Sequence, residues 1–317
     1  INRKGSIKWI NISIRLIIRE NMILNVSGRT DIVAFYTNWF MNRYHAGYLD
    51  VRNPFNDNLV SRINFSDVDL ILFCTKNPIP IINKIQEIDK PIIFHITITP
   101  YLKDIEPHVP NKKEIIKAVK TLSKIIGKEN IVIRYDPIFI SERYNVNYHK
   151  KMFERLCSEL EEYVEKMLIS FLDEYKNVKN NKNVLNYRTF TEDDYKEIGI
   201  SFSSSAKKHK MTVQTCFEKR DLKEFGFIKE DCLSQELAYK LTGKKYKKWT
   251  ARKEKLCNCV EMVDIGVYNS CMHYCKYCYA NFDENKVHNN CKNHHNDSTL
   301  LVGYLKDTDT IKVRKEK

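Results

Sequence analysis

The sequence lacks any long, uninterrupted hydrophobic run. The only stretch near the start that is apolar enough to consider is residues 7–18, which is interrupted by Lys8, Asn11, Ser13 and Arg15. A helix needs about 20 consecutive, mostly apolar residues to cross a bilayer. This stretch is too polar for a membrane span or for the apolar region of an export signal. We therefore expect a cytoplasmic protein without a membrane partner.

Acidic residues are scarce relative to basic ones. The chain has 40 Asp and Glu against 53 Lys and Arg, which gives a formal net charge of +13 at pH 7. Such an excess is compatible with nucleic-acid binding, but Ile, Asn and Lys are abundant throughout, and net charge concerns association rather than fold. In the densest basic segment, residues 243–255, Tyr246 and Trp249 lie among lysines and an arginine. A nucleic-acid contact and a solvated connection are both compatible with this segment.

The composition is that of a folded protein with metal or redox chemistry. Hydrophobic residues make up 43% of the 317 residues, with 18 Tyr and 15 Phe, which excludes a disordered chain. Ten cysteines in a cytoplasmic protein indicate metal binding or redox chemistry rather than disulfides.

Seven short apolar runs of strand length recur after Met22. They are apolar on both faces, as expected for strands of a parallel sheet that is covered by helices. The predicted strands are residues 23–27, 69–74, 91–98, 130–135, 166–172, 211–216 and 262–267.

Helical patterns lie between the predicted strands. Residues 112–126 carry one apolar stripe and are followed by Gly127, a natural helix end. A second stripe consists of Met152, Leu156, Leu160 and Val164, and Thr30 or Asp31 can cap a helix over 32–44. The alternation predicts an α/β fold, a complete or partial (β/α) barrel, with an open doubly wound sheet as the alternative.

Polar or chemically capable residues follow almost every predicted strand. In barrels the active site is built at the carboxyl ends of the strands, although such loops are polar in any case. The residues at these ends are Arg29, Asp31, Lys76, Asn77, Thr99, Arg134, Asp136, Asp173, Glu174, Cys216 and Glu218.

Four of these positions have two competing interpretations. Asp31 is either a helix cap or a catalytic group, and the cap is favoured. Lys76 either neutralises a cofactor carboxylate or is solvated. Arg134 and Asp136 form a structural ion pair or act on a substrate. Together with Glu218, a candidate acid or base, they are the predicted catalytic residues.

Near the end of the chain, "CMHYCKYC" places Cys271, Cys275 and Cys278 at spacings of four and three positions. Thiolates of intracellular proteins bind zinc or iron–sulfur clusters. Three cysteines can hold three corners of a cubic [4Fe–4S] cluster and leave the fourth iron open. An open iron can chelate the amine and carboxylate of S-adenosylmethionine.

Zinc is the alternative ligand for this loop. The fourth zinc ligand would come from His273, Cys291, His294 or His295. Classical zinc sites pair two C-x2-C motifs, whereas here only the last two cysteines of the loop form one. The spacing therefore favours the open cluster.

The loop resembles the CxxxCxΦC signature of the radical S-adenosylmethionine superfamily, with Tyr277 as the aromatic residue. The wider pattern resembles the bacterial family called domain of unknown function 1848, through "SGRTDIVAFYTNWFMNR", "VRNPFN", "TKNP", "RYDPIF", "TCFE" and "CNCVEMVDIGVYNSCMHYCKYCYAN". The resemblance implies a cluster, S-adenosylmethionine, and an electron donor such as flavodoxin or ferredoxin. It implies no particular reaction.

In that superfamily the cluster loop follows the first barrel strand, whereas here it follows the seventh. A circular permutation explains this placement: residues 262–267 take the place of the first strand and residues 23–27 that of the second. The resemblance then places Ser27, Gly28 and Arg29 at the cofactor's amino group. It gives Tyr277, Tyr279 and Asn281 as further cofactor-binding candidates, the last two in an adenine pocket or as packing residues.

Four other cysteines can form a second metal centre. Cys216, Cys232, Cys257 and Cys259 supply the number of thiolates that fully ligates another cubic cluster. Such a cluster would relay electrons or bind substrate. The alternative is that they are small buried hydrophobes, which is the favoured interpretation for Cys74 and Cys157.

The predicted organisation is one domain after an N-terminal extension. Residues 1–21 show no clear hydrophobic periodicity and are expected to lie outside the fold. Residues 22–256 are expected to form the βα-repeat body, and residues 257–317 to carry the last strand and the cluster segment. The predicted function is reductive cleavage of S-adenosylmethionine and hydrogen abstraction from an unknown small-molecule, peptide or nucleic-acid substrate. The alternatives are a non-catalytic iron–sulfur electron-transfer or sensing protein and a zinc-dependent nucleic-acid-binding protein.

Overall fold

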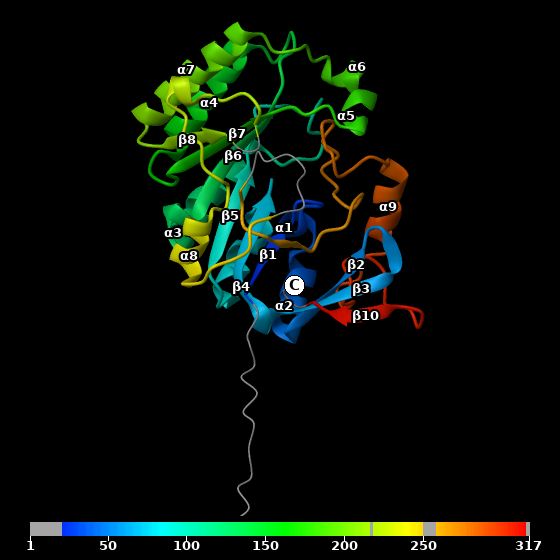
Figure 1. The fold of residues 1–317 in the computed structure, drawn as a ribbon. Coiled ribbons are helices and arrows are strands. Elements are labelled where there is room, and N and C mark those ends of the chain that lie inside the picture. Colours follow the sequence, from blue (N-terminus) through cyan, green and yellow to red (C-terminus); the bar gives the residue numbers. More distant parts are fainter. Residues whose placement is uncertain (1–20, 216–217, 250–257, 315–317) are drawn as a thin grey trace, which may run out of the picture.

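The fold is built on a seven-stranded, fully parallel sheet (Figure 1). The computed structural model describes residues 21–215, 218–249 and 258–314, and the predicted extension 1–21 therefore lies almost wholly outside the described residues. All seven predicted strands and the α/β class are confirmed. The strands are β1 (Met22–Val26), β4 (Val68–Thr75), β5 (Ile92–Thr97), β6 (Ile131–Ile138), β7 (Lys166–Phe171), β8 (Thr212–Thr215) and β9 (Val263–Asp264).

The strand order is β8-β7-β6-β5-β4-β1-β9. The last strand of the sheet in sequence thus lies beside the first, with Leu24 opposite Val263 and Asn25 opposite Asp264. Within the described ranges no ladder joins β8 to β9, so these strands are the two edges and the sheet is not a closed barrel.

Helices connect most strands of the sheet. The stripe over 112–126 forms α3 as predicted, capped by the Asn111 side chain and ended at Gly127, whose φ of 86° favours glycine. The helices are α1 (Ile32–Phe35), α2 (Thr37–Ala46), α3 (Lys112–Ile126), α4 (Val146–Leu160), α5 (Lys176–Asn180), α6 (Lys182–Leu185), α7 (Glu192–Lys208), α8 (Gln235–Thr242) and α9 (Glu284–Lys292), with short 3-10 turns η1 (Phe65–Asp67), η2 (Ile79–Glu87), η3 (Lys128–Asn130) and η4 (Lys223–Phe225).

Two helix predictions need correction. The helix expected over 32–44 is broken at Tyr36 into α1 and α2. The Tyr36 hydroxyl donates to the Ser270 carbonyl oxygen at 2.5 Å, a tertiary contact that ties the break to the cysteine-rich loop. The second stripe forms α4, but this helix ends at Leu160, so Val164 lies beyond it.

A second sheet of three strands was not predicted. It has the order β10-β3-β2, formed by β2 (Tyr48–Asn53), β3 (Asn56–Asn64) and β10 (Thr310–Val313). Polar residues interrupt the apolar ones in all three strands, so none of them contains a continuous apolar run; β2 and β3 are partly buried and β10 is exposed. Arg52 pairs with Asp309 at 2.6 Å and fastens the end of the described chain to this sheet.

The two faces of the large sheet are covered differently. Alternate residues of β1, β4, β5 and β6 pack under the helices in the main core. The intervening residues form a second apolar cluster with the described part of the connection between β8 and β9, including α8 (yellow in Figure 1). This connection, called the covering segment below, contributes Leu233, Ala238, Tyr246 and Val260. No helix in the described part of the chain has the length and apolar character to cross a membrane.

Candidate functional site

The three-cysteine loop follows β9 and lies at the carboxyl ends of the strands. The thiols of Cys271, Cys275 and Cys278 are free and half-buried. Asn281 clamps the start of the loop, because its side-chain amide donates to the Cys271 carbonyl oxygen and accepts from the Cys271 N–H at 3.4 Å. The Ala280 N–H donates to the Cys278 sulfur at 3.3 Å. Asn281, predicted to line an adenine pocket or to pack, thus holds the loop itself.

Burial raises the pKa of all three thiols. The positive charge of Lys76 acts in the opposite direction on Cys275 and Cys278. The loop therefore favours thiolates only in the presence of positive charge, which a bound metal supplies.

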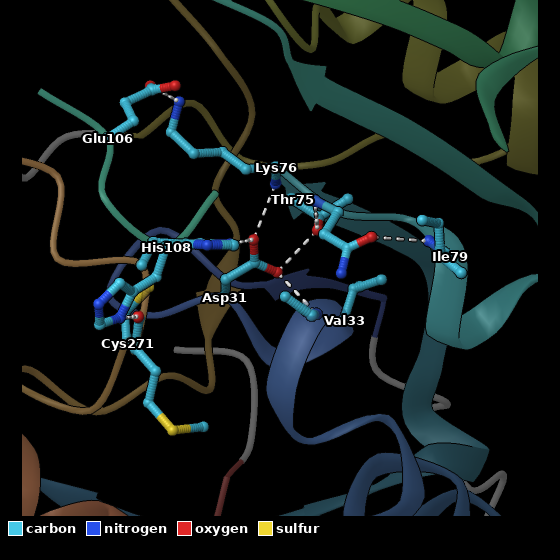
Figure 2. Close-up of polar contacts among 12 residues, drawn as sticks. Asp31, Val33, Thr75, Lys76, Ile79, Glu106, His108 and Cys271 are labelled. Carbon is cyan, nitrogen blue, oxygen red and sulfur yellow. Dashed lines mark hydrogen bonds and ion pairs between the residues drawn. The ribbon is translucent and has the colours of Figure 1, made fainter. Parts of the chain in front are cut away.

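The buried carboxylate of Asp31 joins three parts of the chain (Figure 2). Its Oδ1 accepts from the Ala34 N–H at 2.9 Å and from the Thr75 hydroxyl at 2.7 Å. Its Oδ2 accepts from the Lys76 N–H at 2.7 Å and interacts with His273 Nε2 at 2.9 Å. The helix-cap interpretation is confirmed, and the same carboxylate also links β1 and β4 to the cysteine loop.

Glu106 is the second buried carboxylate at the site, with 1% of the residue exposed. It accepts from the Thr99 hydroxyl at 2.6 Å, pairs with Lys76 at 2.8 Å and with Lys112, and accepts from the Tyr277 hydroxyl. Burial opposes its ionisation, but the two lysines outweigh that cost and lower its pKa to about 2.

This network places two predicted cofactor-binding residues. Lys76 is not solvated: it is paired with Glu106, and its ammonium lies 5.4 Å from the centre of the Tyr277 ring. The ring of Tyr277 is buried in an aromatic cluster with Tyr101 and Tyr144. Tyr277 therefore links the cysteine loop to Glu106.

Asp264, at the end of β9, organises the turn after β1. Its carboxylate accepts from the Ser27 hydroxyl at 2.9 Å, from the Gly28 N–H at 2.7 Å and from Arg29 Nε at 3.1 Å. A Cβ at Gly266 would lie 1.9 Å from Ser27 Oγ, so the two turns are in close contact. Asp264 was not among the predicted site residues. Its position in the strand that leads into the cysteine loop could have indicated a role at the site.

The predicted group Ser27, Gly28 and Arg29 is thus brought to the cysteine loop. The Tyr279 hydroxyl donates to the Gly28 carbonyl oxygen, which adds a direct link between the turn and the residue after Cys278. The guanidinium of Arg29 is already engaged, because its Nη2 also donates to the Asp264 carbonyl oxygen at 2.5 Å.

Two of the three predicted catalytic residues, Arg134 and Asp136, lie within β6, and the third, Glu218, follows β8. Arg134 and Asp136 form the expected ion pair. Glu218 accepts from the Phe171 N–H at 2.7 Å. Burial, together with the negative charges of Asp173 and Asp136, raises the pKa of Glu218 to about 8. Glu218 therefore carries a proton at neutral pH and can donate it.

All four candidates for a fourth zinc ligand make other contacts, although Nδ1 of His273 has no hydrogen-bond partner among the described residues. Besides the contact of His273 with Asp31, both ring nitrogens of His294 have partners, the Leu301 carbonyl oxygen at 2.8 Å and Asn296 Oδ1 at 3.3 Å. The Cys291 sulfur lies 3.3 Å from the Tyr36 hydroxyl. The His295 ring stacks on Tyr304. In the described ranges no three His, Cys, Asp or Glu side chains are grouped for one metal ion.

Only half of the predicted second cysteine group can be located. The sulfurs of Cys232 and Cys259 lie 3.5 Å apart. Cys216 and Cys257 fall outside the described residues, as does part of the basic segment 243–255.

The model of a family described as "Domain of unknown function (DUF1848)" matches residues 23–280. The chain belongs to this family. The DUF1848 match spans all seven strands of the large sheet and ends just after Cys278, so the cysteine loop is part of the family domain. The predicted resemblance to DUF1848 is confirmed. No curated protein matches the chain.

The low pKa of Glu106 predicts an acid-dependent contribution to stability. Because this pKa is about 2 in the fold against 4.5 ordinarily, Glu106 stabilises the fold above pH 4.5, and the contribution is lost as the pH falls towards 2. Replacing Glu106 by Gln should lower the unfolding free energy by about 3 kcal/mol near neutral pH. Urea unfolding between pH 7 and pH 3 measures the difference.

The matched control is Glu197→Gln, which removes the exposed ion pair with Lys150. Its effect should stay below about 1 kcal/mol at every pH. If the Glu106→Gln difference has already vanished at pH 5, the carboxylate is not held ionised by its lysines.

The raised pKa of Glu218 predicts the opposite pH dependence. Between pH 4.5 and about 8 the folded chain holds a proton that the unfolded chain has lost, so stability falls as the pH rises through this window. The Glu218→Gln variant does not have this loss. Its unfolding free energy, taken relative to that of wild type, should therefore rise by up to about 4 kcal/mol from pH 5 to pH 8. Parallel pH profiles for wild type and Glu218→Gln, measured by urea unfolding, would contradict the assignment; the exposed Glu114→Gln change is the control.

Proposed function

We propose that the chain is a radical S-adenosylmethionine-type iron–sulfur enzyme. The observation that carries the proposal is the position of the loop: three free thiols on one clamped turn at the carboxyl edge of a parallel sheet. Candidate acid–base groups and cations lie at the same edge, as a site for a charged cofactor requires.

The donor set fits a cluster with one open corner. Cys271, Cys275 and Cys278 would hold three irons, and the nearby thiol of Cys291 is engaged with Tyr36 instead. The ring of His273 in the loop is buried, and its Nδ1 has no hydrogen-bond partner in the part of the chain that the structure describes. A buried polar atom without a partner is costly, so this nitrogen fits a site that receives a further polar group.

Strand order supports a permuted relation to the superfamily. The strand before the cysteines is β9, and its neighbour is β1, the strand proposed to follow it in the unpermuted order. The open sheet would then correspond to a partial barrel in which β9 and β1 are neighbours in space, although they are the last and the first strand of this sheet in the sequence.

A cluster held by the three cysteines would, once reduced by a donor such as flavodoxin or ferredoxin, supply the electron for reductive cleavage of S-adenosylmethionine to methionine and a 5′-deoxyadenosyl radical. This radical would abstract hydrogen from the substrate. Lys76 offsets the negative charge of the thiolates, with Asp31 holding its backbone N–H. Asp264 fixes the Ser27–Arg29 turn by accepting from the Gly28 N–H, and this turn would lie beside the cofactor. Glu218 holds a proton beside Asp136 and Asp173 at the far side of the same edge.

An anaerobic cleavage assay tests the proposal. Reconstituted wild-type protein should hold about four irons at the loop and release 5′-deoxyadenosine with dithionite and S-adenosylmethionine. The Cys271→Ala, Cys275→Ala and Cys278→Ala variants should each lose the product, because each removes one of only three ligands. Cys157→Ala, at a buried cysteine of α4, should behave as wild type.

The alternative functions give different results in the same assay. Iron-loaded protein that never forms 5′-deoxyadenosine would show an electron-transfer or sensing protein. Purified protein that holds zinc instead of iron would support the zinc-dependent nucleic-acid-binding protein.

A further inference from the structure

A row of polar side chains lies on the face of the large sheet that the covering segment packs against. Leu72 of β4 and Ile93 of β5 are register partners and belong to the apolar cluster on this face. Two residues further along, Cys74 and His95 are register partners as well. Because side chains alternate along a strand, Cys74 and His95 point to the same face as Leu72 and Ile93.

His95 has an unexplained polar atom. Only 2% of the residue is exposed, and among the described residues its Nε2 has no hydrogen-bond partner. Burial lowers the pKa of His95 to about 4, so the ring is neutral at physiological pH. A neutral, buried imidazole with a free nitrogen is the form of histidine that binds metal ions.

Two thiols approach the same face from the covering segment. Cys259 is buried, with 1% exposed, and its sulfur lies 3.5 Å from that of Cys232. Cys232 packs against the same apolar cluster as Cys74. A Cys232 thiolate would lie close enough to raise the pKa of both Cys74 and His95 by its charge.

The separation of the two sulfurs is informative. Two thiolates on one tetrahedral zinc ion, each at about 2.3 Å, are about 3.8 Å apart. The separation of 3.5 Å between the Cys232 and Cys259 sulfurs is close to that value, whereas a disulfide requires about 2.05 Å.

We propose that Cys232, Cys259 and His95 ligate a second metal centre, of the thiolate–imidazole type that suits Zn²⁺, with Cys74 beside it as the fourth donor. This site is separate from the three-cysteine loop and does not rest on the proposed enzymatic function. It differs from the four-cysteine cluster expected from the sequence, because two of its donors come from the strands.

The proposal gives the centre a structural role. His95 and Cys74 belong to the sheet, whereas Cys232 and Cys259 belong to the covering segment, so a shared metal would fasten the segment to the sheet. In the described residues the donors are not grouped around one ion position. We therefore expect metal uptake to draw the segment towards β4 and β5.

Co²⁺ binding to the full chain tests the second centre. The Cys271→Ala, Cys275→Ala, Cys278→Ala triple variant removes the first site, and Co²⁺ is added to the reduced protein without oxygen. One equivalent should bind with a thiolate-to-cobalt charge-transfer band and the visible bands of a tetrahedral ion. Cys259→Ser should abolish the charge-transfer band in this background, and Cys157→Ser should not change it.

Histidine ligation has its own readout. His95→Ala should shift the visible bands and weaken Co²⁺ binding at least tenfold, and His95→Cys should restore tight binding with a stronger charge-transfer band. Circular dichroism establishes that each variant is folded; if the triple variant is not, the same substitutions in the wild-type chain are compared by zinc content.

Two results would overturn the proposal. One is a folded, reduced triple variant with no cobalt–thiolate band. The other is a His95→Ala variant whose affinity and visible bands equal those of its parent. Because the first site is absent in this background, neither result depends on whether the chain cleaves S-adenosylmethionine.

Discussion

The four contacts made by the Asp31 carboxylate hold the candidate site together. One oxygen caps α1 and accepts from Thr75, and the other accepts from the backbone of Lys76 and contacts His273. A buried carboxylate is costly unless several donors surround it, so the position of each donor is constrained by the others. Through this single side chain the end of β1, the end of β4 and the cysteine loop become one unit.

The same edge of the sheet contains carboxyl groups with opposite electrostatic surroundings. Glu106 lies between two lysines and stays ionised, whereas Glu218 is buried near other carboxylates and keeps its proton. Environments that push the pKa values of two acids apart are typical of sites that must hold charge in one place and move a proton in another. This contrast supports the proposal that the edge is a functional site.

Much of the fold was predictable because its strands are buried on both faces. Runs such as residues 69–74 and 130–135 are mainly apolar, and each formed a strand of the parallel sheet. The β2–β3–β10 sheet was not predictable in this way, because polar residues interrupt its strands and leave no continuous apolar run. The break at Tyr36 depends on Ser270, which lies 234 positions away in the sequence.

The sequence by itself determined the α/β class, the family and the three thiols of the loop, since burial patterns and ligand spacing are local properties. Only the tertiary structure decided which distant residues meet. The pairing of β9 with β1 brings Asp264 to the Ser27–Arg29 turn, and the covering segment brings Cys232 to the apolar cluster that Cys74 also packs against. These contacts join residues more than 150 positions apart, and no periodicity or spacing within one segment encodes such a contact, because it depends on how the strands are ordered in space.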